Sequence, residues 1–154
     1  MKHSFLMVVA FMTMMVCSAS SCDKNDDNSN TENTTPMANG KIKIKVGSQI
    51  FMATLLDNNS AKAFQEMLPL TINMIELNNN EKYYDLPKSL PTNSSNPGTI
   101  KNGDLMLYGS KTLVLFYKTF STSYSYTKLG AVDDATGLAS ALGSGNVTVT
   151  FEKE

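Results

Sequence analysis

Two short runs that are apolar at successive positions constrain the fold of this chain most. The runs at 104–108 and 112–117 flank a Gly109-Ser110 pair, which is typical of a tight β-hairpin turn. A strand that is apolar on both faces, rather than at alternate positions, has to be covered on both sides. We therefore expect a β-sheet in which these two strands are central.

Other parts of the sequence show the alternation of a half-buried strand. Residues 41–46 alternate lysines with Ile42, Ile44 and Val46, so one face of this strand is expected to be wet. A Gly47-Ser48 pair then predicts a second hairpin. The remaining predicted strands are 49–56, 71–77, 82–85 and 147–151, with an asparagine turn at 78–80.

Two short helices are predicted between the strands. The first follows candidate N-caps at 58–60 and ends before Pro69, while the second is capped by the aspartates at 133–134 and ends at Gly143. The proline-rich stretch 86–98 is irregular, and a loop of this length is often a binding loop. About eight short strands with two small helices predict a closed barrel with plugged openings.

The N-terminus has the features of a secretory signal. Lys2 gives a positive start, 5–16 is an almost unbroken apolar run, and small residues lead to Cys22. The run is shorter than the about 20 residues of a membrane-spanning helix. Residues 1–21 are therefore predicted to be a lipoprotein signal peptide, with Cys22 as the lipidated residue. The alternative is ordinary cleavage that leaves Cys22 as a free thiol.

Residues 22–39 are polar and acidic without an apolar cluster, which predicts a disordered tether. The aspartates at 23, 26 and 27 resemble the export signal of surface lipoproteins in the Bacteroidetes, although a generic solvated linker has the same composition. We expect an exported protein that is anchored to the outer membrane, on its periplasmic or surface face, through the lipid on Cys22. The folded domain is expected at 40–154.

Composition excludes several chemistries from the mature chain. Cleavage removes His3, the only histidine, and the sequence contains neither arginine nor tryptophan. Without Lys2, 12 of the 13 lysines remain against 14 acidic residues, and this charge of −2 does not favour a nucleic-acid partner. Without histidine or free cysteine, we predict no metal site and no cofactor. No Ser-His pair is available either, so no catalytic residue is assigned.

Three blocks of the sequence stand in a specific order, namely GDLMLYG, LVLFYKTFSTSYSYT and GSGNVTV. They resemble the cyclophilin-like domain family of small bacterial proteins. The resemblance covers nearly all of 40–154 and implies a mainly β fold, a closed eight-stranded barrel with two short helices. It does not imply prolyl isomerase activity, because the enzymatic cyclophilins use an arginine that this chain lacks, and lysine has no equivalent planar fork.

The candidate ligand site is the stretch rich in tyrosines and hydroxyls that follows the second buried strand. Tyrosine combines apolar area with a hydrogen-bonding tip, which suits recognition of peptides or small ligands. The other interpretation is a hairpin whose tyrosines cover the barrel wall. Two further tyrosines and the proline-rich loop would form the second bank of the site. The candidate ligand-binding residues are Tyr83, Tyr84, Tyr117, Phe120, Ser121, Thr122, Tyr124 and Tyr126.

The favoured function is a non-catalytic module at the cell envelope that binds a peptide or a small ligand. The alternative is a divergent peptidyl-prolyl isomerase or another enzyme that uses the barrel groove. Glu76, Glu81 and Asp85 flank the asparagine turn and could do acid–base chemistry. On a β-hairpin, however, such carboxylates are expected to form a solvated face.

Overall fold

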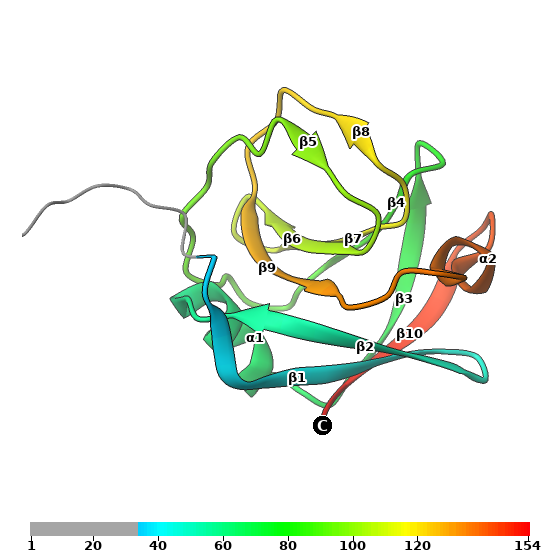
Figure 1. The fold of residues 1–154 in the computed structure, drawn as a ribbon, viewed down its shortest axis with the longest axis horizontal. Coiled ribbons are helices and arrows are strands. Elements are labelled where there is room, and N and C mark those ends of the chain that lie inside the picture. Colours follow the sequence, from blue (N-terminus) through cyan, green and yellow to red (C-terminus); the bar gives the residue numbers. More distant parts are fainter. Residues whose placement is uncertain (1–33) are drawn as a thin grey trace, which may run out of the picture. The chain divides into compact units, whose positions relative to one another are not determined.

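Eight antiparallel strands form a closed barrel (Figure 1). The computed structural model describes residues 34–154, so the predicted signal peptide and Cys22 lie outside the described residues. The predicted mainly β fold with a closed eight-stranded barrel is confirmed. Around the barrel the strands follow the order β1 (Pro36–Val46), β10 (Val147–Lys153), β3 (Leu70–Leu77), β4 (Glu81–Asp85), β7 (Thr112–Phe116), β6 (Asp104–Tyr108), β9 (Thr127–Val132) and β2 (Gln49–Leu56).

Alternation sets the faces of the first hairpin, as predicted. Ile42, Ile44 and Val46 are buried in the barrel, and the turn after them has a left-handed Gly47 with φ +59°. The second predicted hairpin also forms, but its turn has three residues instead of two. Tyr108 lies opposite Thr112, so Lys111 joins the glycine and serine in the turn.

The strands β6 and β7 are covered on both faces, as their composition predicts. Their inward leucines belong to the main barrel core, while Met106, Val114 and Phe116 face outward into a second, smaller hydrophobic cluster. β5 (Thr99–Ile100) pairs with β8 (Phe120–Ser121), and this two-stranded sheet supplies Ile100 and Phe120 to the second cluster. Figure 1 shows this small sheet on the side of β6 and β7 that is turned away from β1 and β2.

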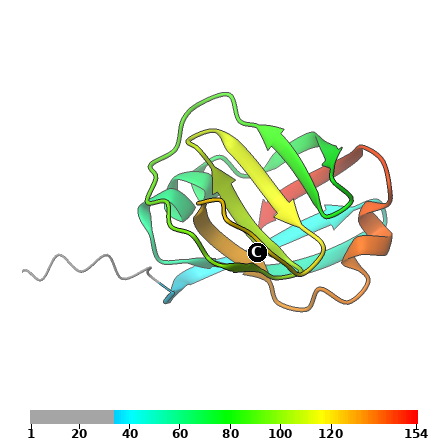
Figure 2. The same ribbon diagram turned by 90° about the horizontal axis from the view of Figure 1, so that it is seen from above.

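α1 (Asn59–Glu66) begins as predicted, because Asn58 Oδ1 accepts a hydrogen bond from the backbone N–H of Ala61 at 2.8 Å. Its Phe64 lies edge-on to Phe151 inside the barrel, with ring centroids 5.6 Å apart. α2 (Leu138–Leu142) lies at the opposite end of the barrel from α1 in both views (Figures 1 and 2). In the described part of the chain, no helix is long and apolar enough to span a membrane.

The start of α2 differs from the prediction that aspartates cap it. Its N-cap is Gly137, with φ +80°, and no side chain caps the helix. Asp133 instead accepts hydrogen bonds from Lys41 Nζ and Thr54 Oγ1, both at 2.6 Å, because β9 ends beside the hairpin of β1 and β2. The next residue, Asp134, accepts a hydrogen bond from the backbone N–H of Thr136 and so stabilises a turn. The predicted C-terminal Gly143 is confirmed.

The folded part begins before residue 40, where the tether was expected to end. Residues 36–39 belong to β1, and Met37 packs against the barrel core. The sequence did not predict this contact, because the segment is polar and has no apolar cluster. A register shift and the left-handed Asn39, with φ +60°, bend the strand here, and Gln65 Nε2 donates a hydrogen bond to the Asn39 carbonyl. Residues 34–154 lie in one compact unit.

Candidate functional site

The outer face of the barrel at β4 forms the floor of a groove. Tyr83 lies opposite Ile75 on β3 and opposite Val114 on β7. Residues two apart on a strand face the same side, so Glu81 and Asp85 share the outer face with Tyr83. All three line a groove with a volume of about 550 Å³.

Residues 120–126, which follow β7, form one wall of the groove. Phe120 and Tyr126 hold this segment against the sheet, because both belong to the second hydrophobic cluster. Phe116 packs against Phe120 with ring centroids 5.7 Å apart, and lies edge-on to Tyr126 at 5.5 Å. Tyr126 also forms an isolated β-bridge with Ser95. The turn that joins β3 to β4 contributes further lining residues, among them Asn80.

Five aromatic side chains gather around the groove, and one of them contacts two of the others. Tyr108 packs edge-on to Tyr124, with centroids 6.2 Å apart, and lies 5.6 Å from Tyr126. Tyr108 is 48% exposed and Tyr124 is 62% exposed, so both side chains are accessible to a ligand. Such an arrangement offers apolar surface together with hydroxyl groups. The other two rings belong to Tyr83 and Phe120.

The groove is acidic. Within the described part of the chain its lining includes the carboxylates of Glu81 and Asp85 and no lysine. Burial raises the pKa of the Glu81 carboxyl, and the charge of Glu76 raises it further. Asp85 Oδ1 accepts a hydrogen bond from Thr112 Oγ1 at 2.6 Å. Burial and the charge of Glu81 also raise the pKa of Tyr126, so its hydroxyl remains a hydrogen-bond donor at neutral pH.

The groove brings together six of the eight predicted ligand-binding residues. Tyr84 follows Tyr83 directly on β4, so it faces the opposite side of the sheet and packs against the main core. Tyr117 is 6% exposed and belongs to the same core. Tyr108 lies in the groove although sequence reasoning missed it. The six that line the groove are Tyr83, Phe120, Ser121, Thr122, Tyr124 and Tyr126.

The prediction that the proline-rich loop 86–98 forms the second bank of the groove is wrong, because none of its residues lines the groove. Leu86 and Leu90 are buried in the main core, and their backbone N–H groups donate to the carbonyls of Lys111 and Ser110. The loop is irregular, as predicted, but these contacts hold it beside the turn between β6 and β7. Part of it lines a separate hollow of about 310 Å³ together with α1 residues.

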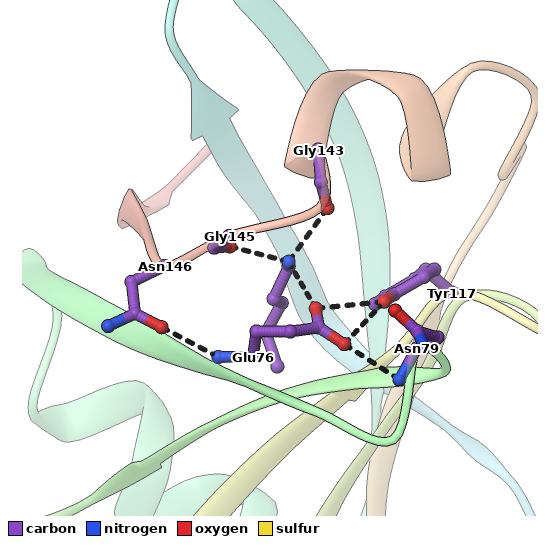
Figure 3. A network of polar contacts seen from close by, with 7 residues as sticks. Glu76, Asn79, Tyr117, Gly143, Gly145 and Asn146 are labelled. Carbon is purple, nitrogen blue, oxygen red and sulfur yellow. Dashed lines mark hydrogen bonds and ion pairs between the residues drawn. The ribbon is translucent and has the colours of Figure 1, made fainter.

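A buried ion pair lies at the end of the barrel near α2 (Figure 3). Lys82 is completely buried, and its ammonium group donates to Glu76 Oε2 and to the carbonyl oxygens of Gly143 at 2.8 Å and Gly145 at 2.6 Å. Three acceptors satisfy all three hydrogens of the ammonium group. The same Nζ lies 5.2 Å from the centre of the Tyr117 ring. The lysine therefore serves as a structural bridge from β4 to the loop after α2.

Glu76 is the centre of this network, which corrects the prediction of a solvated face. Its carboxylate also accepts from the Tyr117 hydroxyl, at 2.8 and 2.9 Å, and from the backbone N–H of Asn79 at 2.8 Å. Burial raises its pKa, but these hydrogen bonds and the Lys82 charge outweigh burial and hold the pKa below 4.5. Burial, together with Glu76, raises the pKa of Tyr117 to about 12.

No metal centre competes with the groove as a site within residues 34–154. In that range no three histidine, cysteine, aspartate or glutamate side chains are arranged to hold a metal ion. The groove instead combines rings, hydroxyls and carboxylates, which can bind and orient a ligand. Of the carboxylates around the turn, Glu81 lies in the groove and Glu76 in the barrel interior.

Comparisons with known proteins agree with the barrel. Residues 44–152 match the family model described as the Cyclophilin-like family. A hypothetical protein from Archaeoglobus fulgidus, solved in solution, has a similar fold with a TM-score of 0.53 and 15% sequence identity, covering 74% of this chain and 94% of that one. No curated protein matches the sequence. At this identity the archaeal structure shows the fold alone.

Proposed function

The chain belongs to the cyclophilin-like family, and we propose that its barrel is a non-catalytic module that binds a peptide or a small ligand in the groove. The observation that carries the proposal is the gathering of five aromatic side chains around a space of about 550 Å³. Ligand sites commonly measure about 300–1,000 Å³ and combine apolar rings with a few polar groups. The groove has both.

The competing function is a divergent prolyl isomerase. That reaction benefits from a fixed cationic donor aimed at the rotating amide, but the sequence has no arginine, and its only histidine is His3. Lys82 cannot replace them, because its ammonium group is buried among acceptors of its own. We expect Thr31–Glu154 to give no acceleration in a protease-coupled assay with a proline peptide. Turnover in that assay would favour the enzyme.

The binding function predicts that an exposed groove tyrosine matters for affinity. Tyr124→Ala is expected to weaken binding of blocked peptides with a central proline or phenylalanine by about tenfold, because the variant removes an accessible ring face. Amide chemical shifts of Thr31–Glu154 during titration measure both the affinity and the place of binding. Ile50→Ala is the matched control, since Ile50 is 57% exposed on β2 and does not line the groove. Equal affinities for the two variants, or shifts confined to other surfaces, would contradict the proposal.

We further propose that the module is displayed on the cell envelope by a lipid on Cys22. The support is the order of features in the sequence, with an apolar run, small residues, a cysteine and then a polar stretch. Multiple acyl chains anchor a protein stably, whereas one chain anchors it only marginally.

Cys22→Ala is expected to move the protein from the membrane fraction to the soluble fraction, or to stop processing of the precursor. Fractionation followed by mass measurement of the protein decides between these outcomes. Cys17→Ala is the control and should leave both properties unchanged, because Cys17 follows a bulky valine instead of small residues. A Cys22→Ala protein that stays in the membrane with unchanged mass rules out the anchor.

A further inference from the structure

We propose that the groove binds a peptide through an arginine or lysine side chain, whose cationic end meets Glu81 while its stem lies across the tyrosine rings. This inference rests on the proposed binding function and names the class of ligand. It follows from the charges of the groove, from the hydrogen-bonding state of its acceptors and from its aromatic faces.

The first argument is the unpaired state of the groove carboxylates. Glu81 is half-buried, yet within residues 34–154 its carboxylate forms neither a hydrogen bond nor an ion pair. Among the described residues, Asp85 has only the neutral hydroxyl of Thr112 as its partner. A carboxylate that is partly removed from water without a donor is unfavourable. A cationic ligand would pair with this carboxylate and so offset the unfavourable free energy of its partial burial.

The second argument is the contrast with the rest of the described barrel. Lysines neutralise five carboxylates there, and none of these five lines the groove. Lys82, the neighbour of Glu81 in the sequence, points into the barrel and binds Glu76. The groove therefore keeps its negative charge. The five ion pairs are Lys41–Asp133, Lys45–Glu152, Lys62–Asp57, Lys82–Glu76 and Lys128–Asp104.

A third observation concerns a buried amide oxygen in the groove wall. Asn80 lines the groove next to Glu81, and its side-chain oxygen is buried without a hydrogen-bond partner among the described residues. Its carbonyl dipole leaves a further negative end in the wall. The buried oxygen thus adds to the negative potential of the wall, which favours a cationic ligand.

The aromatic lining suits the same ligand. Tyr108 and Tyr124 are exposed side chains that line the groove, and Tyr126 packs against Tyr108. A cation over the face of a tyrosine ring is attracted by the ring, and arginine can also stack on the ring with its planar group. Arginine further forms two parallel hydrogen bonds with a carboxylate. We therefore expect arginine to bind more tightly than lysine.

The test compares two blocked tripeptides, acetyl-Ala-Arg-Ala-amide and the same peptide with citrulline, which has nearly the shape of arginine but no charge. Thr31–Glu154 should bind the arginine peptide at least about tenfold more tightly, a ratio within the range that charge-assisted hydrogen bonds give. In Glu81→Gln the ratio should fall to about one. Salt should weaken only the arginine peptide, because the interaction is electrostatic.

Glu66→Gln is the matched control, since Glu66 is an exposed glutamate on α1 that does not line the groove. It should keep the full preference for arginine. Asp85→Asn provides a second groove variant if Glu81→Gln does not fold, and it should reduce the preference as well. If the proline and phenylalanine peptides bind while arginine and citrulline peptides bind equally, this inference is wrong and the binding function stands. If no peptide binds in the groove, both proposals fall.

Discussion

Replacing Lys82 by methionine is expected to lower the free energy of unfolding by about 3–5 kcal/mol. Methionine keeps most of the apolar stem, but it offers no donor to Glu76 or to the carbonyl oxygens of Gly143 and Gly145. Breaking a buried ion pair is costly because the remaining charge stays largely desolvated. Chemical denaturation followed by circular dichroism measures the loss.

Lys45→Met is the matched control for this prediction. Lys45 also pairs with a glutamate, Glu152, but their side chains are 38% and 34% exposed, so the loss should stay within about 1 kcal/mol. Combining Lys82→Met with Glu76→Gln removes both buried charges and should recover part of the stability. Equal losses for the two single lysine variants would show that the buried pair is no stronger than a surface pair.

The same network predicts how stability changes in acid. Burial raises the pKa of Glu76, but the hydrogen bonds from Lys82 and Tyr117 and the lysine charge bring it below 4.5. A carboxyl group whose pKa is depressed by folding stabilises the protein above its unfolded pKa, and this contribution is lost as the pH falls through the folded pKa. The double variant should therefore lose less stability than the natural protein when the pH falls below about 4.5.

Replacing Gly130 by alanine is expected to cost about 3 kcal/mol or more, at the upper end of the range for overpacked sites. A Cβ at this position would lie 2.3 Å from the carbonyl oxygen of Thr54 and 2.9 Å from the Cα of Leu55. Both atoms belong to the backbone of β2, and Leu55 lies opposite Gly130 in the ladder of β2 and β9. The clash is relieved only when the two strands move apart.

Gly145→Ala is the control for this prediction, because a Cβ there has no atom within 4 Å outside its chain neighbours. The alanine keeps the carbonyl oxygen that binds Lys82, so the change should be within about 0.5 kcal/mol. Denaturation midpoints of the two variants under the same conditions give the comparison. A Gly130→Ala barrel as stable as the Gly145→Ala barrel would show that β9 can shift without cost.

The pattern of apolar residues along the chain carried most of the prediction of the fold. The alternating lysines and aliphatics at 41–46, and the doubly apolar runs that became β6 and β7, placed the barrel wall correctly. The start of α2 escaped prediction because aspartates serve equally well as caps and as partners of distant side chains. Asp133 binds Lys41, which is 92 residues away in the sequence, and a contact over this separation is not predicted by any local sequence pattern.

The candidate site was less predictable, and partly for an avoidable reason. Tyr83 and Tyr84 are neighbours on a strand, so the pleat alone excludes them from sharing one face. The same rule places Tyr108 on the outer face with Met106, two residues earlier in the GDLMLYG block. Lys82 is different. Two of its three acceptors come from the loop after α2, so the sequence contains no local signal that this lysine is buried.

The position of β10 in the barrel has a consequence for the time at which the chain can fold. β10 pairs with β1 on one side and with β3 on the other, and the bond between Lys45 and Glu152 joins residues 107 apart. Until the last strand has emerged, two neighbouring edges stay open and the barrel cannot close. Contacts over such separations also slow folding, because the intervening chain must first be ordered. The barrel therefore closes only after β10 has been made, and this delay suits the passage across a membrane that the proposed export requires.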